Sequence, residues 1–294
     1  MQDLTPQRKR EIKRLLRKTV TLIDNQGFHP RGHVFLDKVV LAHLSKSLNV
    51  AQCVMVMIDA GFPEEAFGVS RTIVEIALNL RYITNRNSEQ RAKRFVHYMA
   101  RWKMELMRRS LKHFYVTDEK GNWILDAKGE KIPQYSKADF KKMLKGKYAM
   151  HAKVAKKYPK RTSWADTGSR ATRGGVWMMA MEPDRYDSVN GMPLKWEFDY
   201  DWMYFWTSQY VHATVISMED GHATRPAQRF IVRKPFQDGH SNADMAAFNT
   251  VVELNKILVM AYRALGHSYP SELADPMGEL IFKMVRGDAG KQQP

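Results

Sequence analysis

The chain has 294 residues, a length that allows one large domain or two small ones. Hydrophobic residues make up 44% of it, enough to bury a core, and this excludes disorder over most of the chain. The single cysteine, Cys53, excludes an internal disulfide framework and a cysteine-based zinc site. No uninterrupted apolar run reaches the roughly 18–20 residues of a membrane span, and the polar N-terminus lacks a signal-peptide core, so we expect a cytoplasmic protein without stable membrane insertion.

The formal charge of +16 is concentrated in three segments. Residues 1–20 carry seven basic and two acidic residues, residues 81–113 ten and two, and residues 137–161 ten and one. Together these segments hold +22, so the rest of the chain carries −6. Separate basic patches predict an anionic partner, with nucleic acid first (RNA before DNA) and an anionic membrane surface second. The alternative is that they are solvated helix faces that bind nothing in particular.

The N-terminal part of the chain predicts three helices. Thr5, as N-cap before a proline, begins the first helix, which runs to Asp24. A long helix is predicted over residues 34–60, closed by Gly61. Another follows over residues 63–84. The short joints favour antiparallel neighbours and therefore a helical bundle.

The middle of the chain is less regular. Ser88 can cap a helix whose apolar seam is Phe95, Met99, Trp102 and Leu106. Two turn signals flank a short β-type run and predict a small β-hairpin insertion over residues 117–132. The basic segment over residues 137–161 is expected to be helical in its centre.

The C-terminal part adds the remaining elements. These are a helix over 200–218, a possible strand at 230–232, a helix from Ser241 or Asn242 to Leu265 that Gly266 closes, and a short helix over 276–285. We therefore predict an all-α fold, a multi-helix bundle with a small β-hairpin insertion. It forms a single domain over residues 1–285, followed by a disordered tail over 286–294.

A first group of candidate site residues lies in the third helix. Arg71, Glu75 and Asn79 are spaced by four residues, which places them on one helix face. Their neighbours are apolar nearly all round, so a partly buried ion pair is expected. It can be an intramolecular clamp, or it can form the floor of an anion or nucleotide pocket.

A second group is Tyr204, Ser208 and His212, which the same spacing places in one polar stripe of an otherwise apolar helix. A neutral histidine there could act as acid or base near pH 7. The alternative is a hydrogen-bonded network that belongs to the core.

A third group is basic. Arg91 and His97 match the loose Arg-x(4–6)-His pattern of HEPN-type ribonucleases, although a solvated basic face explains the same residues. The candidate nucleic-acid contacts are Arg91, Arg94, His97, Arg101, Lys141, Lys142, Lys145, Lys156 and Lys157. We find no metal-ligand pattern, no P-loop, no dinucleotide-binding glycine motif and no nucleophile elbow, so neither metal nor cofactor is predicted.

Several of these residues resemble a known family. The segment Ala66-Phe-Gly-Val-Ser70-Arg71-x3-Glu75, the loop at Trp164 and the Tyr204-x3-Ser208-x3-His212 helix resemble the bacterial domain-of-unknown-function family 5677 over about residues 40–220. The resemblance implies an all-α fold in which Arg71, Glu75, Tyr204, Ser208 and His212 share one polar centre, and it implies no activity. Residues 117–132, residues 137–161 and the C-terminal helix look like additions to that family. A kinship to HEPN-like nucleic-acid proteins is an analogy at the level of the fold.

The leading hypothesis is a nucleic-acid-associated bacterial protein, an RNA-cleaving effector of defence or toxin type that needs no metal. His212 would be the acid or base, Arg71 would stabilise phosphate charge and Glu75 would orient it, with Ser208 and Tyr204 supporting them. The alternative is a non-catalytic helical scaffold, such as a homodimer, whose polar centre is structural.

Overall fold

The computed structural model describes residues 5–26, 32–97, 115–120, 122–134, 138, 199–204, 222–224, 230–232 and 240–286. The chain divides into two compact units, one made of residues 1–89 and 167–294 and the other of residues 90–166. The expectation of a single domain over residues 1–285 stays a prediction.

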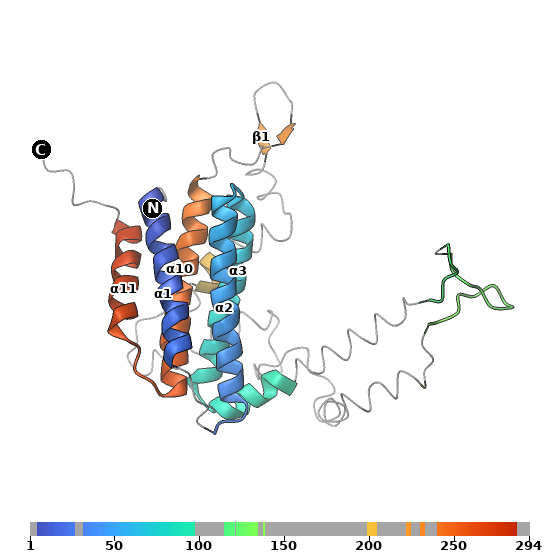
Figure 1. Ribbon diagram of the computed structural model, residues 1–294, viewed down its shortest axis with the longest axis horizontal. Helices are drawn as coiled ribbons and strands as arrows, with labels where there is room; N and C mark the ends of the chain where they lie inside the picture. Colours follow the sequence, from blue (N-terminus) through green and yellow to red (C-terminus); the bar gives the residue numbers. More distant parts are fainter. Residues whose placement is uncertain are drawn as a thin grey trace, which may run out of the picture. The chain divides into compact units, whose positions relative to one another are not determined.

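The first unit is a helical bundle (Figure 1). Its helices are α1 (Pro6–Gln26), α2 (Leu36–Asp59), α3 (Pro63–Asn85), α10 (His240–Leu265) and α11 (Ser271–Arg286). It also holds a π-helical turn, η1 (Asp199–Tyr204), and the short antiparallel strands β1 (His222–Thr224) and β2 (Phe230–Val232). The predicted all-α class is confirmed, and the strand expected at 230–232 is present.

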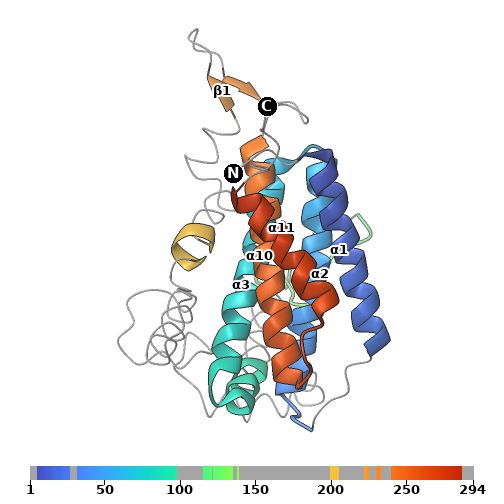
Figure 2. The same cartoon turned by 90° about the vertical axis from the view of Figure 1, so that its left-hand side faces the viewer.

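The core lies between α2, α3 and α10, which all pack against one another. Figures 1 and 2 show α3 and α10 side by side and running in the same direction, with α2 running the opposite way. Large side chains from all three helices are fully buried there, among them Leu44, Leu78 and Leu258. Helix α10 lies beyond residues 40–220, where the sequence resembles the family, and it completes the core on which α3 depends.

Two glycines end helices as the sequence predicts. Gly61 after α2 and Gly266 after α10 have φ values of 79° and 72°, a conformation that costs a residue with a Cβ. In each case the next amide donates back to a carbonyl of the last helical turn, at 2.9 Å after Gly61 and 2.8 Å after Gly266. This is the Schellman arrangement, which satisfies carbonyls that the helix leaves open.

A distant carboxylate caps the N-terminus of α2. Phe35 precedes the helix and offers no side-chain cap. Instead, the two oxygens of Glu89 accept the amides of Phe35 and Leu36 at 3.1 and 2.9 Å. A negative charge at this end also complements the helix dipole. The cap joins the start of α2 to the segment that follows α3.

Helix α11 begins earlier than predicted. The sequence placed its start at Pro276, but the helix begins at Ser271 and contains the proline. A proline cannot donate to the carbonyl four residues before it, here that of Glu272. That carbonyl accepts Lys18 Nζ of α1 at 2.9 Å instead. The predicted start at Pro276 was wrong because Lys18 of α1 supplies the donor that the proline lacks, and the sequence near Pro276 does not show this contact.

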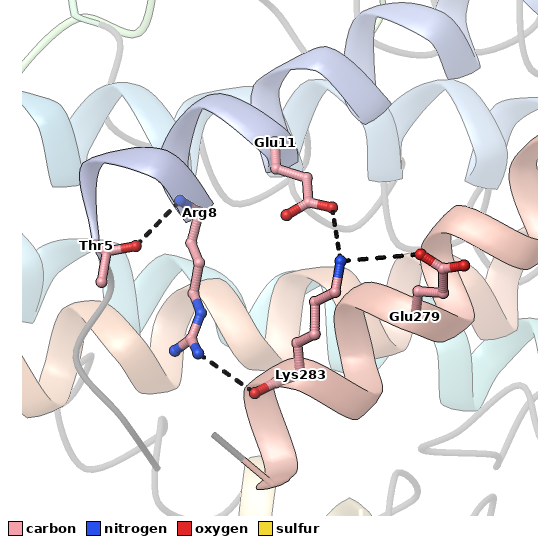
Figure 3. A network of polar contacts seen from close by, with 5 residues as sticks. All are labelled: Thr5, Arg8, Glu11, Glu279 and Lys283. Carbon is pink, nitrogen blue, oxygen red and sulfur yellow. Dashed lines mark hydrogen bonds and ion pairs between the residues drawn. The ribbon is translucent and has the colours of Figure 1, made fainter. Parts of the chain in front are cut away.

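Further contacts hold α11 on α1 (Figure 3). Thr5 accepts the amide of Arg8 at 3.3 Å, which confirms it as the N-cap of α1. The buried Arg8 donates to the carbonyl of Lys283 at 3.4 Å. The Lys283 ammonium lies 3.7 Å from Glu11 and 3.8 Å from Glu279. These bonds fix which side of α1 faces α11.

In the second unit, residues 90–97 are helical, and residues 115–120 and 122–133 form turns and isolated bridges. Asp118 and Asp126 each accept two amides of the turn that follows, as the turn signals predicted. The predicted hairpin over 117–132 is not seen as paired strands. The described residues there form isolated antiparallel bridges, such as Thr117 to Trp123, because the two tight turns leave too little chain between them for a ladder.

Other predictions fall on residues that are not described. They include the apolar seam beyond residue 97, the basic helix over 137–161 and the helix over 200–218 beyond Tyr204. Among the described helices, α2 is long and apolar enough to cross a membrane by length and composition, although 56% of its most apolar stretch is buried in the bundle. Isolated polar residues interrupt the apolar run of α2, so the sequence alone did not mark this predicted helix as a candidate membrane span.

Candidate functional site

Helix α3 presents a polar stripe inside a mostly apolar environment. Arg71 and Glu75 are half-buried and Asn79 is buried, at successive turns of the helix. The flanking Ile73 and Val74 are fully buried. The spacing of four residues therefore places a cation, a carboxyl group and an amide in one row, as the sequence predicts.

Arg71 is bound to a residue 133 positions away in the chain. Its Nη2 donates to the Tyr204 hydroxyl at 2.6 Å, and its guanidinium carbon lies 4.5 Å from the centre of the Tyr204 ring. Tyr204 in turn stacks on Tyr200, with ring centres 5.1 Å apart and an interplanar angle of 21°. The contact is a charge-assisted hydrogen bond combined with a cation–π interaction.

Tyr200 and Tyr204 both belong to η1, which packs against α3. A π-helical turn is rare and often occurs at functional sites. The two tyrosines are spaced four positions apart, and the turn brings their rings into a stack. The Tyr204 ring is therefore held by two contacts, the stack on Tyr200 and the guanidinium of Arg71. Local sequence patterns could not show that α3 and η1 touch.

Glu75 has a perturbed proton affinity. Burial raises the pKa of its carboxyl group above the ordinary value, and the positive charge of Arg71 partly opposes this shift. A carboxyl group with a raised pKa exchanges its proton closer to neutral pH than a solvated one does. Such groups serve as general acids and bases, although structural ion pairs can be perturbed in the same way.

We call Arg71, Glu75 and Tyr204 the Arg71 site. It combines a guanidinium group held by a phenol with a half-buried carboxyl group whose pKa is raised by burial. The Asn79 side-chain oxygen, one turn further on, is buried and has no hydrogen-bond partner among the described residues. The part of the chain that the structure describes contains no group of three His, Cys, Asp or Glu side chains able to hold a metal ion.

The other predicted site residues are placed as follows. Ser208 and His212 lie outside the described residues. Arg91 is buried, with 6% of its surface exposed, so it does not lie on an open basic face as expected. Arg94 and His97 are half-buried. The remaining candidates, Arg101, Lys141, Lys142, Lys145, Lys156 and Lys157, lie outside the described residues.

Polar residues in α10 and α1 were not among the residues predicted from the sequence. Asn249 and Glu253 of α10 are fully buried, and Glu253 accepts Lys256 Nζ at 2.7 Å. Three arginines of α1, Arg10, Arg14 and Arg17, are exposed. The net charge of residues 1–20 indicated a basic segment that includes these arginines, but only the packing of α1 shows which of its basic residues face solvent.

Comparison with known proteins identifies one family. The sequence model described as "Family of unknown function (DUF5677)" matches residues 37–228. This range contains α3, η1 and all of α2 except its first residue, and it leaves α1, α10 and α11 outside. No curated protein and no solved structure matches the chain.

Proposed function

The chain belongs to the DUF5677 family, whose description states no activity, and we propose that it is a nucleic-acid-associated protein that cleaves RNA at the Arg71 site. The observation that carries the proposal is the pairing of Arg71 with Tyr204 beside a carboxyl group, Glu75, whose pKa burial raises. The formal charge of +16 supports a polyanionic partner.

The proposed reaction uses the 2′-hydroxyl of RNA as the nucleophile. The Glu75 carboxylate takes the proton of this hydroxyl, whose oxygen forms a bond to the adjacent phosphorus while the bond from phosphorus to the 5′-oxygen breaks. The products are a 2′,3′-cyclic phosphate and a 5′-hydroxyl. A second acid, for which the sequence offers His212, protonates the leaving oxygen. Arg71 stabilises the charge on the phosphoryl oxygens, and Tyr204 positions Arg71.

A specific observation favours a second candidate, the non-catalytic scaffold. The guanidinium of Arg71 contacts both the ring and the hydroxyl of Tyr204. Because Arg71 belongs to α3 and Tyr204 to η1, this contact holds the two elements together. An arginine used in this way stabilises the fold even when no ligand is present. On this reading the Arg71 site is a structural clamp, and the chain acts as a helical interaction protein. A homodimer and a cytoplasmic location are compatible with either function and stay predictions.

The experiment that separates the two functions compares Glu75→Gln with the wild-type chain. Purified full-length protein is incubated with an end-labelled RNA oligonucleotide in EDTA, and its melting temperature is measured in parallel. Glutamine keeps the shape of the side chain and removes the proton-transfer group. Because burial already disfavours the charged carboxylate, we expect little change in stability.

A reaction centre predicts that Glu75→Gln lowers the cleavage rate by about 100-fold or more at an unchanged melting temperature. The matched control is Ser70→Ala, a buried neighbour on α3 whose hydroxyl bonds to the carbonyl of Phe67. It should leave the rate unchanged. Equal cleavage by the wild type and Glu75→Gln, or no cleavage by either, would reject the proposal and leave the scaffold.

A further inference from the structure

Helix α1 packs in the bundle through one apolar face. Ile12, Leu15 and Leu16 are buried with at most 4% of their surface exposed. α1 contacts α2 and α11. The apolar face therefore points into the bundle, and the rest of the helix is divided between two flanks and an outer face.

The two flanks are occupied by bonds to neighbouring helices. On one flank Arg8 and Glu11 bind Lys283 of α11, as Figure 3 shows, and Lys18 donates to the carbonyl of Glu272. On the other flank Lys13 forms an ion pair with Asp59 of α2. These contacts explain four of the charged residues of α1 as parts of the fold.

The outer face holds three arginines for which the described part of the structure shows no bond to another helix. Arg10, Arg14 and Arg17 are exposed, and their spacing of four and three residues places them on one side of the helix, opposite the apolar face. The first turn of α1 contains no acidic residue. Like charges at this spacing destabilise a helix by about 0.2–0.5 kcal/mol per pair, and a cation near the N-terminus also opposes the helix dipole.

We propose that Arg10, Arg14 and Arg17 form a binding face for the phosphate backbone of RNA. This inference rests on the proposed function, and it places substrate docking on a helix outside the residues that match the family. From Arg10 to Arg17 the helix rises by about 10 Å, so the three guanidinium groups can contact more than one phosphate of the same strand. Guanidinium groups bind phosphate oxygens through paired hydrogen bonds.

The same face does not suit a lipid surface. A helix that lies on a membrane needs an apolar face that enters the lipid, with cations beside it. The apolar face of α1 is buried in the bundle, and none of the large hydrophobic side chains exposed in the described residues belongs to α1. The outer face of α1 therefore offers cations for phosphate groups but no apolar side chains for lipid, and this favours a nucleic acid over a bilayer.

The test measures RNA binding by fluorescence anisotropy between 50 and 200 mM salt, with a labelled 20-nucleotide RNA as probe. The triple variant Arg10→Gln, Arg14→Gln and Arg17→Gln is compared with a control that loses the same charge elsewhere. The control is Lys38→Gln, Lys46→Gln and Arg263→Gln, three exposed positions on α2 and α10. Circular dichroism melting checks that both variants fold.

We expect the α1 variant to bind about 100-fold more weakly at 0.1 M salt and to reduce the slope of log affinity against log salt by about 2, since each phosphate contact contributes about 0.7 on single strands. The control should change affinity less than threefold. If the wild-type chain binds RNA and both variants weaken it equally, the inference fails while the proposed function stands. If the wild type does not bind RNA at 50 mM salt, both fail. Binding to phosphatidylserine vesicles that the α1 variant alone loses, with RNA binding unchanged, would reassign the face to membranes.

Discussion

Removal of the Glu89 carboxylate should destabilise the start of α2. In Glu89→Ala the amides of Phe35 and Leu36 lose acceptors at 3.1 and 2.9 Å, and no side-chain cap from Phe35 replaces them. Loss of an N-cap costs about 0.5–2 kcal/mol, and hydrogen bonds to charged groups lie at the upper end. We therefore expect a loss of about 2 kcal/mol in the free energy of unfolding, and about half of that for Glu89→Gln, which keeps one acceptor oxygen.

Urea unfolding followed by circular dichroism measures this change, and hydrogen exchange shows where it acts. The Phe35 and Leu36 amides should exchange faster in the variant, because they lose their acceptors, while amides in the centre of α10 change only with global stability. Glu119→Ala, at an exposed turn, is the control for loss of one negative charge. A Glu89→Ala chain within about 0.5 kcal/mol of that control would refute the capping argument.

Three further predictions concern titration and the Arg71 site. Burial lowers the pKa of His43 below 6.5, so the unfolded chain binds more protons than the folded chain as pH falls through about 6.5. The free energy of unfolding should therefore decrease between pH 7.5 and 5.5, and His43→Asn should flatten this slope in urea titrations. The pKa of Glu75 is raised above 4.5, so just above that pH the folded chain binds more protons than the unfolded chain. The free energy of unfolding should therefore decrease as pH rises above 4.5, and Glu75→Gln should abolish that decrease. The same pH dependence of stability in the wild type and the variant would contradict the assigned burial of Glu75. Tyr204→Phe removes the 2.6 Å hydrogen bond from Arg71 but keeps the ring, so thermal unfolding should show a loss of about 1 kcal/mol in the free energy of unfolding. A variant as stable as the wild type would mean that the Tyr204 hydroxyl does not fix Arg71.

The sequence predicted the elements whose ends are marked by local chemistry. Thr5 caps α1 as expected, and Gly61 and Gly266 end α2 and α10 because each supplies a positive φ that other residues avoid. The helix predicted over residues 34–60 is α2, and the one over 63–84 is α3. These signals act within one or two turns of the chain, so they can be read without the fold.

Features that depend on distant partners could not be predicted. Pro276 ends a helix in isolation, but Lys18 supplies the missing donor from α1, so α11 continues through it. Arg91 belongs to a basic segment and is nevertheless buried. The role of α10 in the core was missed because its apolar periodicity does not say which helix it packs against.

The candidate site divides in the same way. The row of Arg71 and Glu75 follows from helical spacing alone. Its contact with Tyr204 joins segments 133 residues apart, and the raised pKa of Glu75 depends on burial by the surrounding helices. Neither the contact between Arg71 and Tyr204 nor the pKa shift of Glu75 can be predicted from a local sequence pattern. The positive charge of α1 was visible in the sequence, but the contacts to α2 and α11 decide which of its cations stay on the surface.

The central claim is that the Arg71 site cleaves RNA with Glu75 as the proton acceptor. The most direct test is the rate of RNA cleavage between pH 4 and 8 in EDTA, for the wild type and Glu75→Gln. We expect the wild-type rate to rise with pH through a pKa above 4.5, and the variant to be slow and to lack that rise. The same pH profile and rate in both proteins would contradict it.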